Sequence, residues 1–217
     1  MLSLGAQTVV LGASQSPATP SARAAANASR AAQPPSIDGR DDDAAWRDAT
    51  PITEFRQFDP VEDAEPSMPT EARVTYDDAH LYLFVRAYDP RPDSIIALLS
   101  RRDVRTASDQ IKVMIDSYHD RRTGFEFAVN PAGVKRDYYA YDDGAEDVSW
   151  DAVWDVATRI DSLGWTAEFR IPLSQLRYPP AASHTFGVMI IRELARRNER
   201  VSWPLLRRSR NGLVSQF

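Results

Sequence analysis

AHLYLFVRAYD, residues 79–89, is the stretch of the sequence that decides the fold. Its side chains alternate between two sets, with Leu81, Leu83, Val85 and Ala87 in one and Tyr82, Phe84, Arg86 and Tyr88 in the other. Successive side chains of a β-strand point to opposite faces of a sheet, and those of a helix do not. This period of two therefore predicts a half-buried strand.

The same alternation recurs outward from this strand, at residues 111–116, 125–130 and 165–171. Residues 186–191 are apolar at almost every position, which predicts a central strand. Turn-forming residues separate these runs, and the helix signals are short, at residues 41–48, 94–99 and 173–176. Many short strands without long helices between them predict an all-β fold, an antiparallel β-sandwich of the jelly-roll kind.

Composition excludes several classes of function. The chain has 217 residues, of which 43% are hydrophobic and 26% charged, as in ordinary soluble domains. A net charge of −5 argues against a nucleic-acid partner, because nucleic-acid-binding proteins carry a basic surface. The chain has no Cys, so disulfides, thiolate catalysis and Cys-based metal sites are excluded. Its three His, at positions 80, 119 and 184, are too scattered for a helical zinc motif.

Residues 1–35 differ from the rest of the chain. They contain ten Ala, two Arg and neither an acidic nor an aromatic residue, so we expect them to be disordered. Residues 2–12 are mildly apolar, but the positive residues lie downstream of them, which makes a partial match to an export signal. We interpret the segment as a truncated export signal with a linker; a cytosolic tail is the alternative. The predicted domain then spans residues 36–204.

Residues 138–155, YYAYDDGAEDVSWDAVWD, combine five aromatic side chains with six carboxylates. This combination suits a sugar site, because rings offer contact area at low entropic cost and carboxylates accept hydrogen bonds from hydroxyl groups. We expect Trp154 to lie in the core. For Trp150 two roles remain: its ring contacts a ligand, or it packs inside the protein. The acids Asp142 and Asp143 raise the hypothesis of a structural Ca²⁺, although the spacing is not that of an EF-hand.

A second polar cluster combines Arg102 with Asp109, as a ligand clamp or as a surface ion-pair network. Catalysis has little support. A glycosidase needs two carboxylates at a set separation, but 31 acidic residues make such pairs inevitable. Neither a nucleophile elbow, a P-loop nor a dinucleotide-binding glycine pattern is present. We predict no enzymatic activity for this chain and no cofactor beyond the possible calcium.

Several motifs resemble family 9 carbohydrate-binding modules. These are IDG at 37–39, DAAW at 43–46 and GWTAE at 164–168. More narrowly, RRTGFEFAVNPAGVKRD at 121–137, EDVSWDAVWD at 146–155 and VSWP at 201–204 resemble the variant found ahead of a bacterial outer-membrane β-barrel. The resemblance covers residues 37–217.

This resemblance implies a β-sandwich that binds carbohydrate in the periplasm or outer membrane, with residues 205–217 leading toward a C-terminal β-barrel. Sugar-binding members hold a terminal sugar between two Trp rings, with Arg, Glu and Asn nearby; only the Arg102/Asp109 segment and the Trp150 region have a match here, and the first of the two Trp rings has no clear counterpart. We assign the expected sugar contacts to five residues: Arg102, Asp109, Asn130, Asp147 and Trp150. The alternatives are a structural domain that caps the barrel and, less favoured, part of a glycoside hydrolase. Binding of the isolated domain to a glycan array would distinguish the first two.

Overall fold

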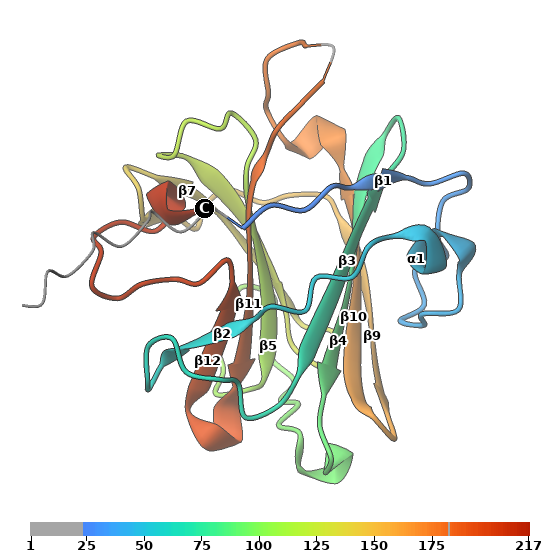
Figure 1. Ribbon diagram of the computed structural model, residues 1–217, viewed down its shortest axis with the longest axis vertical. Coiled ribbons are helices and arrows are strands. Elements are labelled where there is room, and N and C mark those ends of the chain that lie inside the picture. Colours follow the sequence, from blue (N-terminus) through green and yellow to red (C-terminus); the bar gives the residue numbers. More distant parts are fainter. Residues whose placement is uncertain (1–23, 182) are drawn as a thin grey trace, which may run out of the picture.

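The computed structural model describes residues 24–181 and 183–217, which form two β-sheets packed face to face (Figure 1). The five-stranded sheet has the order β1 (Ser29–Arg30), β3 (Thr70–Tyr76), β4 (His80–Tyr88), β10 (Gly164–Pro172) and β9 (Asp155–Asp161). The seven-stranded sheet has the order β2 (Arg56–Asp59), β12 (Glu199–Trp203), β11 (Gly187–Leu194), β5 (Gln110–Asp116), β6 (Gly124–Val129), β7 (Lys135–Tyr141) and β8 (Ala145–Asp147). Among the described strands, β1 and β3 alone run parallel. The predicted antiparallel β-sandwich is confirmed.

The stretch that decides the fold forms β4, and its two sets of side chains do point to opposite faces. Leu81, Leu83 and Val85 enter the core between the sheets. The other face is also covered, because Tyr82 and Phe84 are buried against Trp46 of helix α1 (Ala44–Asp48). A half-buried strand was thus the wrong expectation here, since a segment about forty residues away in sequence covers its outer face.

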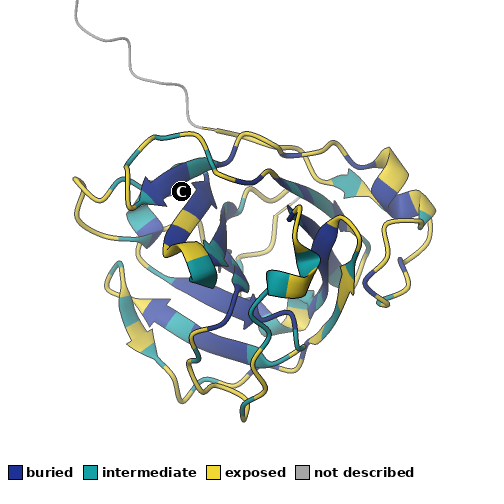
Figure 2. Ribbon diagram, turned by 90° about the horizontal axis from the view of Figure 1, so that it is seen from below, coloured by how far each residue is buried: buried dark blue, intermediate teal, exposed yellow. Residues whose placement is uncertain are grey.

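A second apolar cluster lies on the outer face of the seven-stranded sheet. Met114, Met189 and Ile191 pack there against Val214 and Phe217 of the C-terminal segment. Residues 205–217 therefore pack on the outer face of this sheet; that they begin a connection to a C-terminal region stays a prediction. Figure 2 shows most strand segments as buried, with the exposed residues concentrated in the loops.

The helical elements are short. Besides α1 they are the 3-10 turns η1 (Pro92–Ser94), η2 (Leu173–Gln175), η3 (Ala195–Arg197) and η4 (Val214–Gln216). The helix expected at residues 94–99 does not form, because the backbone of Ile96 and Leu98 bonds instead to Ser108 and Asp109. Within the described residues, no helix has the length and apolar character needed to cross a membrane.

The expected disorder of residues 1–35 needs a correction at its C-terminal end. Residues 1–23 lie outside the described residues. Ser29–Arg30 form β1 beside β3, where Thr75 donates its hydroxyl to the Ser29 carbonyl at 2.7 Å. Hydrogen bonds to the edge of the sheet hold this strand in place, and buried apolar side chains do not contribute. Amino-acid composition therefore could not indicate it.

Candidate functional site

The loop of residues 148–154 leads from β8 into β9 and carries both Trp side chains of the predicted sugar segment. Trp154 is buried, stacked on Phe169 with ring centroids 5.8 Å apart, which is the core position expected from the sequence. Trp150 is half-buried. Its ring packs on the core, 4.9 Å from the ring of Phe125 and 5.9 Å from that of Phe127, and part of the residue remains exposed.

One buried carboxylate, Asp137 on β7, organises this loop. It accepts hydrogen bonds from the indole of Trp154 at 2.8 Å, from the backbone N–H of Ala152 at 3.1 Å and from the guanidinium of Arg102 at 2.5 Å. Sequence reasoning missed Asp137. The available signal was its position, because it alternates with the outward-facing Arg136 and so points toward the inner side of the sheet.

Arg102 contacts the loop that carries Trp150, and most of its contacts hold that loop to β7. Besides Asp137 it donates to the Ala152 carbonyl at 2.9 Å, and it pairs with Asp151 at 2.5 Å. The side chain of Asp151 is 71% exposed and that of Arg102 is 35% exposed. This ion pair therefore keeps polar atoms available to a ligand, directly beside Trp150.

The other three predicted contacts lie in separate local structures. Asp109 is buried, and its Oδ1 accepts the backbone N–H of Ala195 at 3.1 Å. Burial raises the pKa of its carboxyl group. Arg102 and Asp109 thus contact different partners, so the polar cluster expected from their spacing does not form. The reason is that Asp103, next to Arg102, bonds to the backbone of Lys135 and Asp137 on β7, whereas Asp109 bonds to Ala195 after β11.

Asn130 and Asp147 stabilise turns. The Asn130 amide donates to the Leu98 carbonyl at 2.7 Å, and its Oδ1 accepts the N–H of Val134 at 3.0 Å. Asp147 accepts both the backbone N–H and the hydroxyl of Ser149, at 3.0 and 2.6 Å. Side chains used in this way have little capacity left for a ligand.

The acids considered for calcium also have protein partners. Asp142 pairs with Arg122 at 3.0 Å, and Asp143 accepts the N–H groups of Leu213 and Ser215 at 3.1 and 2.7 Å. Throughout residues 24–181 and 183–217, no group of three or more His, Cys, Asp or Glu side chains is placed to hold a metal ion. The donor set therefore does not fit Ca²⁺, which takes six to eight oxygen ligands.

The outer face of the seven-stranded sheet carries a paired charge network. Buried Glu126 accepts a hydrogen bond from Arg136 at 2.9 Å and one from the Tyr138 hydroxyl at 2.8 Å, while Lys112 pairs with Glu193 at 2.5 Å. Burial raises the pKa of Glu126. The cavity beside this network, next to Ala128, holds only about 10 Å³, roughly the space of one water. This cavity is therefore too small for a sugar ring.

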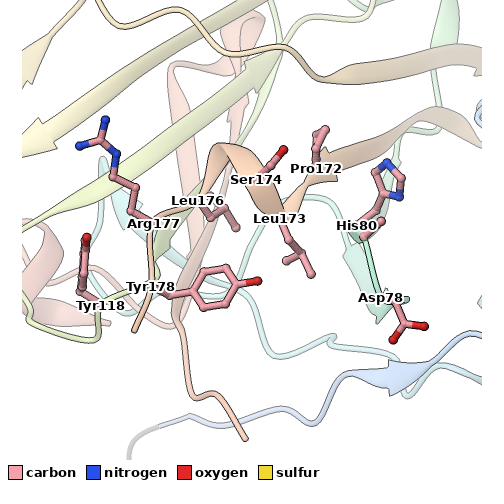
Figure 3. Close-up of a pocket in the computed structure, with 10 residues that line it drawn as sticks. Asp78, His80, Tyr118, Pro172, Leu173, Ser174, Leu176, Arg177 and Tyr178 are labelled. Carbon is pink, nitrogen blue, oxygen red and sulfur yellow. The ribbon is translucent and has the colours of Figure 1, made fainter. Parts of the chain in front are cut away.

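An open pocket of about 630 Å³ lies beside η2 (Figure 3). Polar and aromatic side chains from the start of β4 and the turn before it, from the β5–β6 hairpin, and from η2 and the segment after it line this pocket: Asp78, His80, Tyr118, Ser174, Arg177 and Tyr178. The link to the loop is the Gln175 side chain, which accepts the Val153 N–H at 3.1 Å. No sequence motif indicated this pocket, because its lining comes from three distant segments.

Comparisons with known proteins show the family and the fold. A family model described as carbohydrate family 9 binding domain-like matches residues 37–205. The fold is similar to that of a family 9 carbohydrate binding module from Caldicellulosiruptor kristjanssonii in complex with glucose, with 20% identity over 88% of this chain and 91% of that chain and a TM-score of 0.58. A family 9 module from the same organism in complex with cellotriose shows 19% identity over 80% of each chain and a TM-score of 0.56. Curated proteins gave no match.

Proposed function

The chain belongs to the carbohydrate family 9 binding domain-like family, and from this premise we propose that it binds carbohydrate, without catalysis, on the open surface of Trp150. The match of residues 37–205 to this family model confirms the resemblance to family 9 carbohydrate-binding modules. The observation that carries the site is the partly exposed indole of Trp150, next in sequence to the exposed Asp151 that pairs with Arg102. Solved relatives in complex with glucose and cellotriose support a glucose-type ligand.

The chemistry of these three side chains suits a sugar ring. The C–H face of a pyranose packs on an aromatic ring, and polar groups at its edge fix the orientation. Asp151 accepts hydrogen bonds from hydroxyl groups, and Arg102 donates to them. Phe125 and Phe127 hold the Trp150 ring from the core side, so little side-chain freedom is lost on binding.

Calorimetric titration of the full chain with glucose, cellotriose, xylotriose and chitotriose tests the proposal. We expect at least one of them to bind, and Trp150→Ala to weaken that binding about tenfold or more, the scale of a lost aromatic platform. Val153→Ala is the matched control, because Val153 is 77% exposed on the same loop. Equal affinities in the two variants, or no binding by any of these sugars, would overturn the proposal.

The structural alternative, a domain that caps an outer-membrane barrel, has one observation in its favour. Trp150 contacts two core rings, as a purely structural side chain would. The same titration separates the two functions, since a structural cap has no sugar affinity for Trp150→Ala to remove.

An exported location, in the periplasm or at the outer membrane ahead of a β-barrel, is part of the proposal. It is supported by the apolar character of residues 2–12, which lie outside the described residues, and by the resemblance of residues 121–137 to the barrel-linked variant. Fractionation of cells that express the tagged protein tests it. Recovery in the cytoplasm alone would contradict this part and leave the sugar-binding proposal intact.

A further inference from the structure

We propose that the pocket beside η2 is a second sugar subsite, so that the domain binds a neutral oligosaccharide reaching from Trp150 to Tyr178. The inference rests on the proposed function and extends it, because it names a ligand of several sugar units and a second aromatic platform. Neither Tyr178 nor the pocket formed part of the site expected from the sequence.

The geometry of the pocket provides the platform. Tyr178 lies in the middle of the lining, between Tyr118 on one side and His80 and Asp78 on the other (Figure 3). The Tyr178 ring is half-buried, with its centroid 4.7 Å from that of His184 in an edge-on contact. Tyr118 is 47% exposed. A ring that its neighbours already hold loses little freedom when a ligand stacks on it.

The polar groups around Tyr178 suit hydroxyl groups. Ser174, Asp78 and Arg177 are exposed. Asp78 pairs with Arg30 at 2.7 Å, and in the part of the chain that the structure describes the Arg177 guanidinium makes no ion pair. The His80 ring completes the lining, with its Nδ1 buried 3.5 Å from the Asp77 carboxylate. Donors and acceptors are thus mixed around one ring, which matches a sugar better than a single carboxylate or phosphate group.

Two contacts place the pocket at the same end of the sandwich as the Trp150 loop. The Gln175 side chain, between the pocket residues Ser174 and Leu176, accepts the Val153 N–H of that loop. The Ser117 hydroxyl donates to the Arg177 carbonyl at 2.6 Å. Ser117 follows β5, and the next strand, β6, supplies Phe125, which contacts Trp150. The two platforms therefore lie at one end of the sandwich, which is the placement that a single extended ligand requires.

Titration of the full chain with glucose and with cellohexaose tests this arrangement. We expect cellohexaose to bind about tenfold more tightly than glucose or better, since a second platform adds stacking energy. Tyr178→Ala should remove this gain and leave the affinity for glucose unchanged. Tyr178→Phe keeps the ring and should keep most of the gain. Leu163→Ala, at the opposite end of β10, is the control that should change neither affinity.

If Tyr178→Ala still binds cellohexaose more tightly than glucose by the same factor, the second subsite is refuted. The proposed glucose binding at Trp150 would not be affected by that result. Failure of both ligands to bind would overturn the second subsite as well, and the trisaccharide panel then decides whether the proposed function falls too. If Tyr178→Ala does not fold, amide spectra of the natural protein replace it. Cellohexaose, unlike glucose, must then shift the signals of Ser174 and Arg177, and identical shifts with both sugars would overturn the inference.

Discussion

The carboxylate of Glu168 on β10 accepts the indole N–H of Trp46 at 2.8 Å, across 122 residues of sequence. Its second oxygen accepts the backbone N–H groups of Asp38 and Gly39, each at 2.8 Å. Two of the motifs that carry the family resemblance, residues 37–46 and 164–168, are therefore held together by one buried acid. These motifs fasten α1 to the outer face of the five-stranded sheet and take no part in the candidate site.

Glu168 should make stability depend on pH. Burial raises its pKa to about 7 from an ordinary value of 4.5. Between these values the folded protein keeps a proton that the unfolded chain loses, so the free energy of unfolding falls as the pH rises from about 4.5 to 7. The expected loss is on the order of 1–3 kcal/mol. Glu168→Gln should reduce this slope in urea unfolding, whereas Glu65→Gln, at an exposed side chain, should not. Equal slopes in both variants would refute the assignment.

The two Trp side chains of the 148–154 loop should differ in their effect on stability. Trp154→Ala removes a buried ring and an indole hydrogen bond to Asp137, at a cost of ~3–5 kcal/mol. Trp150→Ala should cost roughly 1–3 kcal/mol, because its ring is half-buried against Phe125 and Phe127. Chemical denaturation measures both values. A Trp150→Ala cost equal to that of Trp154→Ala would mean that the ring serves the core alone.

Arg192 links the two sheets. From β11 it donates to the Pro69 and Tyr88 carbonyls beside β3 and β4, each at 2.7 Å, and its side chain is fully buried. Burial lowers its pKa to about 10, so it remains charged at neutral pH. Arg192→Met should cost ~3–5 kcal/mol, because it removes the guanidinium hydrogen bonds to both carbonyls and the charge facing buried Asp109.

Arg200→Met is the control for Arg192. Arg200 pairs with Asp59 at the surface, and its loss should cost about 1 kcal/mol or less. Urea unfolding of both variants measures the difference. Similar costs for the two would show that the buried guanidinium contributes no more than a surface ion pair.

Asp143 should hold the C-terminal segment against the sandwich. Asp143→Ala removes the side-chain acceptor of the Ser215 N–H, so hydrogen exchange at this amide should accelerate, whereas the Leu213 N–H keeps the main-chain carbonyl of residue 143 at 2.8 Å. The local cost should be ~1–3 kcal/mol, that of leaving the Ser215 donor unpaired. Asp142→Ala is the matched control, because within the described residues Asp142 pairs with exposed Arg122 alone. Equal exchange in the two variants would contradict an anchoring role for Asp143.

Several features were readable from local sequence. The period of two at residues 79–89, 111–116 and 165–171 assigned side chains to faces, because that alternation depends only on strand geometry. The core position of Trp154 followed from its place at the start of a strand. The partners of Arg102 and Asp109 did not follow, since their chain spacing says nothing about the turn between them.

The sequence by itself determined an all-β sandwich, its main strands and the family of the domain, because these follow from short-range alternation and local motifs. Only the tertiary structure decided which polar side chains serve the fold and which remain open to a ligand. Asp137, Glu168 and Arg192 are indistinguishable in sequence from surface charges, and each becomes structural because folding buries it beside donors or acceptors from distant segments. Trp150 and Tyr178 reach the same end of the sandwich for the same reason: strand pairing across long chain separations places them there.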